Sequence, residues 1–103
     1  YTERIALTYG ATLTPDCNDG LSRSVTMTGD QVINAPTNGV SGMILTLKML
    51  ASGADRELTF HADIKKPTGA TYEATVASGS TRVIQLEYNG TAWMLIKNLE
   101  FVA

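Results

Sequence analysis

Apolar and polar side chains alternate along most of this chain, and this period of two constrains the fold more than any other feature of the sequence. Alternation over about four to eight residues indicates a β-strand with one face toward the core and the other toward solvent. Val40–Leu50 also has apolar residues at helical spacing, but Gly42 and Thr46 weaken a helix, so we expect a strand there. The alternating stretches are Arg4–Tyr9, Ser24–Thr28, Ile44–Met49, Leu58–Ile64 and Val83–Tyr88.

Clusters of Gly, Pro, Asn and Asp separate these stretches at intervals of about 8–12 residues, which is typical of a sandwich or barrel. Asn89-Gly90 is the strongest hairpin signal, and it predicts a tight turn with positive φ at both residues. We therefore expect one domain over residues 1–103, an all-β, antiparallel β-sandwich of jelly-roll type with about eight strands. The residues expected to face inward are Leu45, Leu47, Leu58, Phe60, Ile84 and Leu86, with Met49 near the sheet edge.

The composition fits a folded domain and argues against several classes of function. Apolar residues make up 44% and charged residues 17% of the 103 residues, which argues against disorder. The net charge is −2 and the only basic pair is Lys65-Lys66, so we expect no nucleic-acid partner. No apolar run approaches the roughly 18 residues of a membrane helix, so we expect no membrane partner. Tyr1 is not an initiator, so the chain is either processed or a piece of a longer protein.

Few residues offer chemistry, and we expect no catalytic, cofactor or metal site. Cys17 is the only cysteine, so it forms no internal disulfide, and we interpret it as a turn or core thiol. His61 is the only histidine and has no spaced nucleophile partner, so we place it at the surface or an interface. A calcium loop counted from Asp16 fails, because its sixth position is Leu21 and its twelfth is Met27. An Asx-type turn is the better interpretation.

Four segments suggest a family. VTMTGDQVINAPTN (Val25–Asn38) is followed by SGMILTLKML (Ser41–Leu50), RELTF (Arg56–Phe60) and the closing RVIQLEYNGTAWMLI (Arg82–Ile96). The pattern resembles small β-sandwich domains of tailed-bacteriophage virion proteins, found in tail, fibre and head-surface proteins. The likeness covers residues 25–96, and Ile64–Pro67 departs from it by lacking an aromatic residue. Residues 1–24 have no counterpart, and we expect either an added strand or an arm that reaches a neighbouring subunit.

The resemblance implies a non-enzymatic structural component of a virion that holds neighbouring capsid or tail proteins together. It also implies a homo-oligomer, a trimer by family analogy. The alternative is a receptor- or carbohydrate-binding domain of a tail fibre or spike, with Trp93, Tyr88 and Tyr72 as a stacking platform for sugars. An enzyme is the third hypothesis, and it lacks a nucleophile–base signature. The candidate contact residues are Tyr1, Tyr9, His61, Tyr72 and Trp93.

Overall fold

The computed structural model describes residues 5–7, 9–69 and 73–101. These residues form an all-β fold of ten strands and one short 3-10 helix, against the expected eight strands. Apart from the second strand of the predicted hairpin, the strands that no predicted alternating stretch covers are only two to four residues long, too short to show a clear alternation. The elements are β1 (Ile5–Leu7), β2 (Thr12–Leu13), η1 (Cys17–Asp19), β3 (Ser22–Met27), β4 (Gln31–Ile33), β5 (Ile44–Ala51), β6 (Arg56–Phe60), β7 (Ile64–Lys65), β8 (Glu73–Val76), β9 (Thr81–Tyr88) and β10 (Trp93–Phe101).

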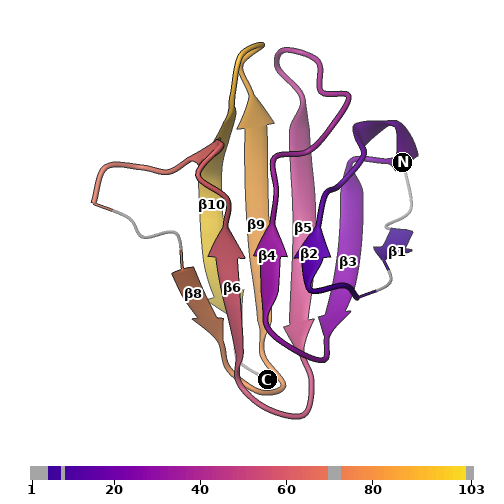
Figure 1. Cartoon of the computed structure of the whole chain (residues 1–103), viewed down its shortest axis with the longest axis vertical. Coiled ribbons are helices and arrows are strands. Elements are labelled where there is room, and N and C mark those ends of the chain that lie inside the picture. Colours follow the sequence, from indigo (N-terminus) through magenta and orange to yellow (C-terminus); the bar gives the residue numbers. More distant parts are fainter. Residues whose placement is uncertain (1–4, 8, 70–72, 102–103) are drawn as a thin grey trace.

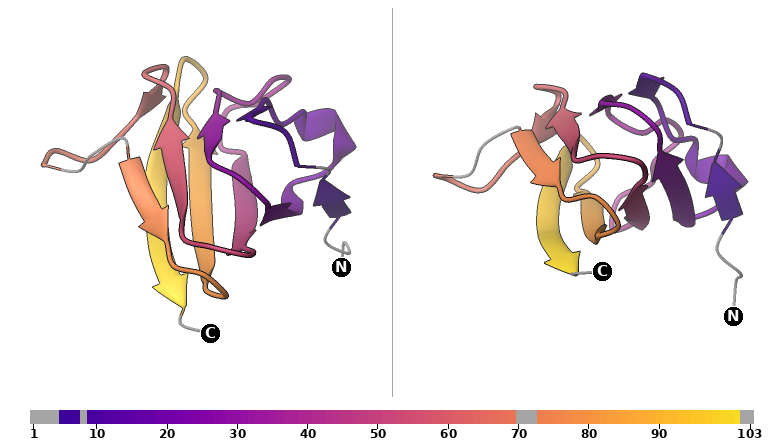
Figure 2. Two further views of the ribbon diagram at one scale, coloured as in Figure 1. Left: turned by 60° about the horizontal axis from the view of Figure 1, so that its bottom comes forward. Right: turned by 90° about the horizontal axis from the view of Figure 1, so that it is seen from below.

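The strands form two sheets with one hydrophobic core. The larger sheet has the order β1-β3-β5-β9-β10-β7, and the smaller has the order β2-β4-β6-β8. Figure 1 shows the smaller sheet in front of the larger one, and Figure 2 shows the two layers from other directions. The residues that alternate inward on β3, β5, β6 and β9 make up most of the core, as the period of two predicted.

The expectation of antiparallel sheets is wrong for the pairs that the first six strands form with one another. The chain passes back and forth between the sheets, so that β1, β3 and β5 lie side by side in one sheet and β2, β4 and β6 in the other. We call β1 to β6 the coiled part, and all four neighbouring pairs within it are parallel. The period of two cannot reveal this, because parallel and antiparallel strands alternate in the same way. A jelly roll consists of antiparallel pairs, so that expectation does not describe this half of the chain.

Each antiparallel pair includes one of the later strands β8, β9 and β10, whereas β7 pairs in parallel with β10. β9 pairs with β5 on one side and with β10 on the other, and β8 pairs with β6. The predicted hairpin between β9 and β10 is confirmed, with Tyr88 directly opposite Trp93. Its turn differs from the expectation, because Gly90 has a φ of 95° but Asn89 has no positive φ. The Asn89 side chain instead accepts hydrogen bonds from the backbone amides of Thr91 and Ala92, which makes a wider, Asx-stabilised turn.

The predicted core is confirmed at all six positions, which are at most 2% exposed. Met49, expected near the sheet edge, is also completely buried, because β5 lies third in the larger sheet with β3 and β9 on its two sides. The sequence places Met49 at the end of an alternating stretch, whereas β5 continues inward to the buried Ala51. The strand assignment for the second half of Val40–Leu50 is confirmed by β5.

Candidate interaction surface

One face of the larger sheet is uncovered in the part of the chain that the structure describes. The smaller sheet packs against the other face only (Figure 2). Residues of β5, β9 and β10 that alternate away from the core therefore lie in the solvent. Some of them are apolar. The exposed residues Leu50, Leu99 and Phe101 gather where β10 ends, whereas Ile44 lies at the other end of β5.

We call Leu50, Val83, Leu99 and Phe101 the outer patch. The strand register brings them together, because Leu99 lies opposite Val83, and both Leu50 and Phe101 lie opposite Thr81. Leu50, Leu99 and Phe101 are 38%, 49% and 53% exposed, and Val83 is partly buried among them. A contiguous group of exposed aliphatic and aromatic side chains on a small domain indicates a surface for binding another molecule.

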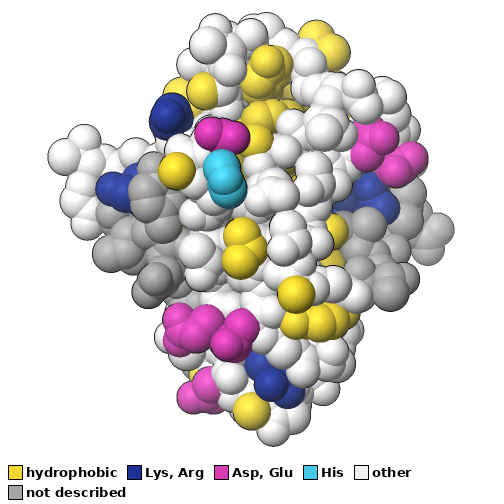
Figure 3. Space-filling model, in the orientation of Figure 1, with side chains coloured by type: hydrophobic (Ala, Val, Ile, Leu, Met, Phe, Trp, Pro, Cys, Tyr) yellow, Lys and Arg dark blue, Asp and Glu magenta, His cyan; other side chains and the backbone are white. Residues whose placement is uncertain are grey.

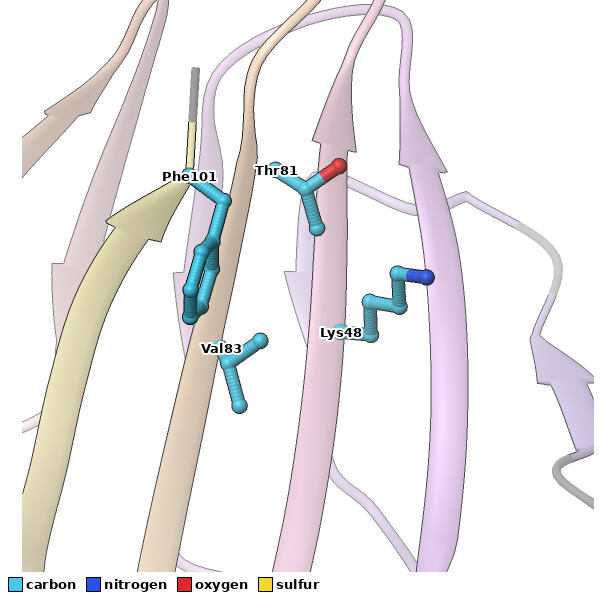
Figure 4. Close-up of a pocket in the computed structure, with 4 residues that line it drawn as sticks. All are labelled: Lys48, Thr81, Val83 and Phe101. Carbon is cyan, nitrogen blue, oxygen red and sulfur yellow. The ribbon is translucent and has the colours of Figure 1, made fainter. Parts of the chain in front are cut away.

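A shallow depression of about 330 Å³ lies within this surface, lined by Lys48, Thr81, Val83 and Phe101. Figure 4 shows these side chains on three adjacent strands, with the Phe101 ring lying over β9 toward Val83 and Lys48 extending toward β3. The depression has an apolar floor, one hydroxyl and one cationic rim residue. It carries no carboxylate–base or nucleophile–base pair, so its chemistry suits contact with an apolar or mixed surface.

The adjoining edge of β10 is also open among the described residues. β7 pairs with β10 only at Trp93 and Met94, so the main chain from Ile96 to Phe101 has a strand on one side alone. The register of β10 against β9 shifts between Leu95 and Lys97, which is a β-bulge. Ile96, at the bulge, is also exposed.

Side chains on the inner face hold this open edge in place. The Arg82 guanidinium donates to the Asn98 side-chain oxygen at 2.8 Å and to the Thr75 carbonyl at 3.0 Å. The same guanidinium lies 3.6 Å from the Glu100 carboxylate, which also accepts from the Ala77 backbone amide at 3.1 Å. Asn98 and Glu100 are therefore fixed from within the domain, and the edge is presented as an ordered strand.

Trp93, a predicted contact residue, lies in the core and is only 3% exposed. Its indole N–H donates to the Pro36 carbonyl at 3.1 Å, and its ring centroid lies 5.0 Å from that of Tyr88. A Cβ at Gly39 would come within 2.6 Å of the Trp93 ring, so the loop passes directly over the indole. This placement favours packing over sugar stacking for Trp93. It also gives the INAPTN and GTAW portions of the quoted segments a shared structural role.

The other predicted contact residues do not gather at one site. The Tyr9 hydroxyl donates to the Asp30 carbonyl at 2.6 Å, and its ring packs against the core. His61 is exposed at the end of β6, visible in Figure 3, and its Nδ1 lies 3.4 Å from the Asp63 carboxylate. Tyr1 and Tyr72 lie outside the described residues. The contact roles of these residues stay predictions.

The segment around Cys17 is structural. Cys17 is buried in η1, and this burial, followed by the nearby Asp16 charge, raises the pKa of its thiol. Asp16 accepts from the Asn38 side chain at 2.8 Å and from the Asn18 amide at 2.9 Å. These two hydrogen bonds lower the pKa of the Asp16 carboxyl, and they confirm the Asx-type turn. The described residues contain no group of three potential metal ligands.

For residues 1–24 the sequence left two roles open. The structure places Ile5–Leu7 beside β3 in the chain's own larger sheet, with Ile5 opposite Arg23. This is the role of an added strand. The arm that reaches a neighbouring subunit stays a prediction for the remaining residues at this end.

Sequence reasoning missed the outer patch, because the sequence indicates an alternating strand there but not which of its faces is exposed. Leu99 and Phe101 alternate with Asn98 and Glu100, just beyond the region that resembles the phage domains. Comparison with family models and with curated proteins finds no match for this chain. No helix among the described residues is long and apolar enough to cross a membrane.

Proposed function

We propose that this domain is a non-enzymatic structural component of a tailed-bacteriophage virion and that it binds neighbouring particle proteins through the outer patch. The resemblance of residues 25–96 supplies the virion context. We also propose that the two facing sheets be classed with the β-sandwiches. The observation that carries the binding role is the exposed apolar group of Leu50, Leu99 and Phe101 beside an open strand edge.

The surface supports protein contact better than ligand capture. An open strand edge and an adjoining apolar face are liabilities in a free protein, and natural proteins cover such edges in assemblies. The alternative of a carbohydrate-binding domain relied on an exposed aromatic platform, but Trp93 is buried and bonded to Pro36. The outer patch offers one aromatic ring, Phe101, with few polar groups that would orient a sugar.

The test is incorporation into particles. Virions produced by the phage that encodes this chain are purified on a density gradient, and their proteins are identified by mass spectrometry. We expect the wild-type chain in the particles and a clear loss of the Leu99→Ser, Phe101→Ser double variant. Val40→Ser is the control, because Val40 is an apolar residue in the loop before β5 that is even more exposed than Leu99 and Phe101. Absence of the wild-type chain from the particles would overturn the proposal.

A further inference from the structure

We infer that the open edge of β10 pairs with the same edge of a second copy of this chain, antiparallel and about a twofold axis through Leu99. The inference deepens the proposed assembly role by naming the partner, and it rests on that role only for its biological setting. The evidence is the direction of the free backbone groups, the residue pattern along the edge, and the charges that each register would bring together.

The hydrogen bonds of β9 fix which backbone groups of β10 are free. Tyr88 exchanges hydrogen bonds with the segment before β5, donating to the Met43 carbonyl and accepting from the Gly42 amide. Because main-chain groups alternate in direction along a strand, Gln85, Val83 and Thr81 point the other way, toward β10. In the strand register, their partners on β10 are Lys97, Leu99 and Phe101. The N–H and C=O groups of Asn98 and Glu100 therefore face the open edge.

A twofold axis through Leu99 uses these free groups. Antiparallel pairing about that axis places Asn98 opposite Glu100 of the second copy, and the reverse, so both positions become hydrogen-bonded pairs. Leu99 then meets its own copy in the closely spaced, non-hydrogen-bonded position, where the side chains are nearest. The two larger sheets would continue into one another, and the two outer patches would join across the axis.

The side chains also fit this register better than the neighbouring ones. On the outer face, Lys97 lies opposite Phe101 of the second copy, where its alkyl chain covers the ring and its ammonium meets the ring face. An axis through Glu100 would instead place two carboxylates directly opposite each other, which is destabilising. An axis through Asn98 would place Glu100 opposite the apolar Ile96. An axis between two residues would pair an inner side chain with an outer one.

Lys97 has a second interpretation, because an exposed lysine on an edge strand often serves to prevent pairing. One lysine in this strand stands among Ile96, Leu99 and Phe101, which are all about half exposed. In the register through Leu99 no lysine faces another cation. Lys97 thus disfavours pairing with other partners and in other registers, but it is compatible with pairing in the register through Leu99.

The test combines the mass of the purified chain with a register-specific crosslink. We expect a dimer by sedimentation equilibrium, and a dissociation constant at least about tenfold higher for Leu99→Lys, which sets two ammonium groups across the axis. Val40→Lys, an exposed control far from the edge in sequence, should leave the dissociation constant of the dimer unchanged. In a Cys17→Ala background, Leu99→Cys should form a disulfide-linked dimer under mild oxidation much faster than Val40→Cys, because opposed Cα atoms in such a pair are within disulfide reach.

Each outcome decides the inference. A monomer at the highest soluble concentration, a trimer, or equal crosslinking of the two cysteine variants would overturn it. Circular dichroism of every variant shows whether the fold is intact. Leu99 and Val40 are both exposed, so we expect their variants to match their own background, wild type or Cys17→Ala. A monomer that is still found in virions would refute this inference and leave the proposed function standing. A dimer that is absent from virions would support this inference and refute the proposed function.

Discussion

Gly39 lies against the indole of Trp93 with less room than any side chain needs. A Cβ at this position would stand 2.6 Å from the ring carbon Cζ2 and 3.1 Å from Cδ2 of Tyr88. The indole cannot move away freely, because its N–H is bonded to the Pro36 carbonyl and its ring is in the core. The glycine is therefore required by contact with the ring, and its backbone φ is not in the left-handed region.

We expect Gly39→Ala to lower the free energy of unfolding by about 1–3 kcal/mol, as overpacking in a well-packed site does. Urea unfolding measured by circular dichroism would give this value. Gly10→Ala is the matched control, because a Cβ there meets only the Thr12 carbonyl at an ordinary 3.5 Å. Equal stability of the two variants would mean that the loop does not pass over Trp93 as the structure shows.

The β9–β10 hairpin sets both the core and the outer surface at this end of the sheet. Its turn contains Gly90, whose φ of 95° is a conformation that other residues rarely adopt. The turn closes with the Asn89 amide donating to the Ala92 carbonyl at 3.1 Å. Because the hairpin supplies Trp93 and the whole of β10, strain at Gly90 should lower the free energy of unfolding of the whole domain.

Gly90→Val should therefore cost about 1–3 kcal/mol of stability through a forced positive φ at a β-branched residue. Thermal unfolding gives the measurement. Thr91→Val is a suitable comparison, since Thr91 has the same size and branching and lies next in the turn at an ordinary φ. We expect Thr91→Val to melt with the parent. If Gly90→Val does so as well, Gly90 does not carry the left-handed position.

The sequence predicted most of the longer strands and the β9–β10 hairpin, but not how the other strands pair. Alternation identified the faces of β5, β6 and β9, because burial of one face imposes the same pattern whatever the neighbouring strand does. Pairing direction depends on the path of the chain between strands. The connections that lead from β1 to β2 and from β3 to β4 are short, and their residues do not indicate that the chain crosses to the other sheet. The two-residue strands were missed because they are too short to show an alternation.

The outer patch was missed for a different physical reason. A continuous period of two would place Leu99 and Phe101 on the same buried face as Trp93 and Leu95. The bulge between Leu95 and Lys97 adds one residue, so every later side chain of β10 changes faces. Nothing in the local residues marks a bulge at Ile96. The candidate surface could therefore be found only from the register in the structure.

At the scale of the whole molecule, the fold is built from contacts between distant parts of the chain. In the coiled part, a strand of the other sheet lies in the sequence between the two members of each parallel pair. Examples are Ser22 opposite Thr46 and Gln31 opposite Leu58. β5 then pairs with β9, bringing Leu45 beside Leu86. Because the entropy of closing these loops is lost before the contacts form, such topologies fold slowly.

Trp93 is the only tryptophan, and its surroundings report another contact between distant parts of the chain. Its N–H bond to Pro36 joins residues 57 positions apart, and its ring leaves water on folding. We expect refolding after denaturant dilution, followed by Trp93 emission, to take about milliseconds to seconds, as in other non-local β-folds. A short unfolding pulse before refolding removes prolyl isomerisation, which takes about 10–100 s, so any remaining slow phase belongs to strand assembly. Completion of the emission change in microseconds would contradict the parallel, long-range pairings of the coiled part.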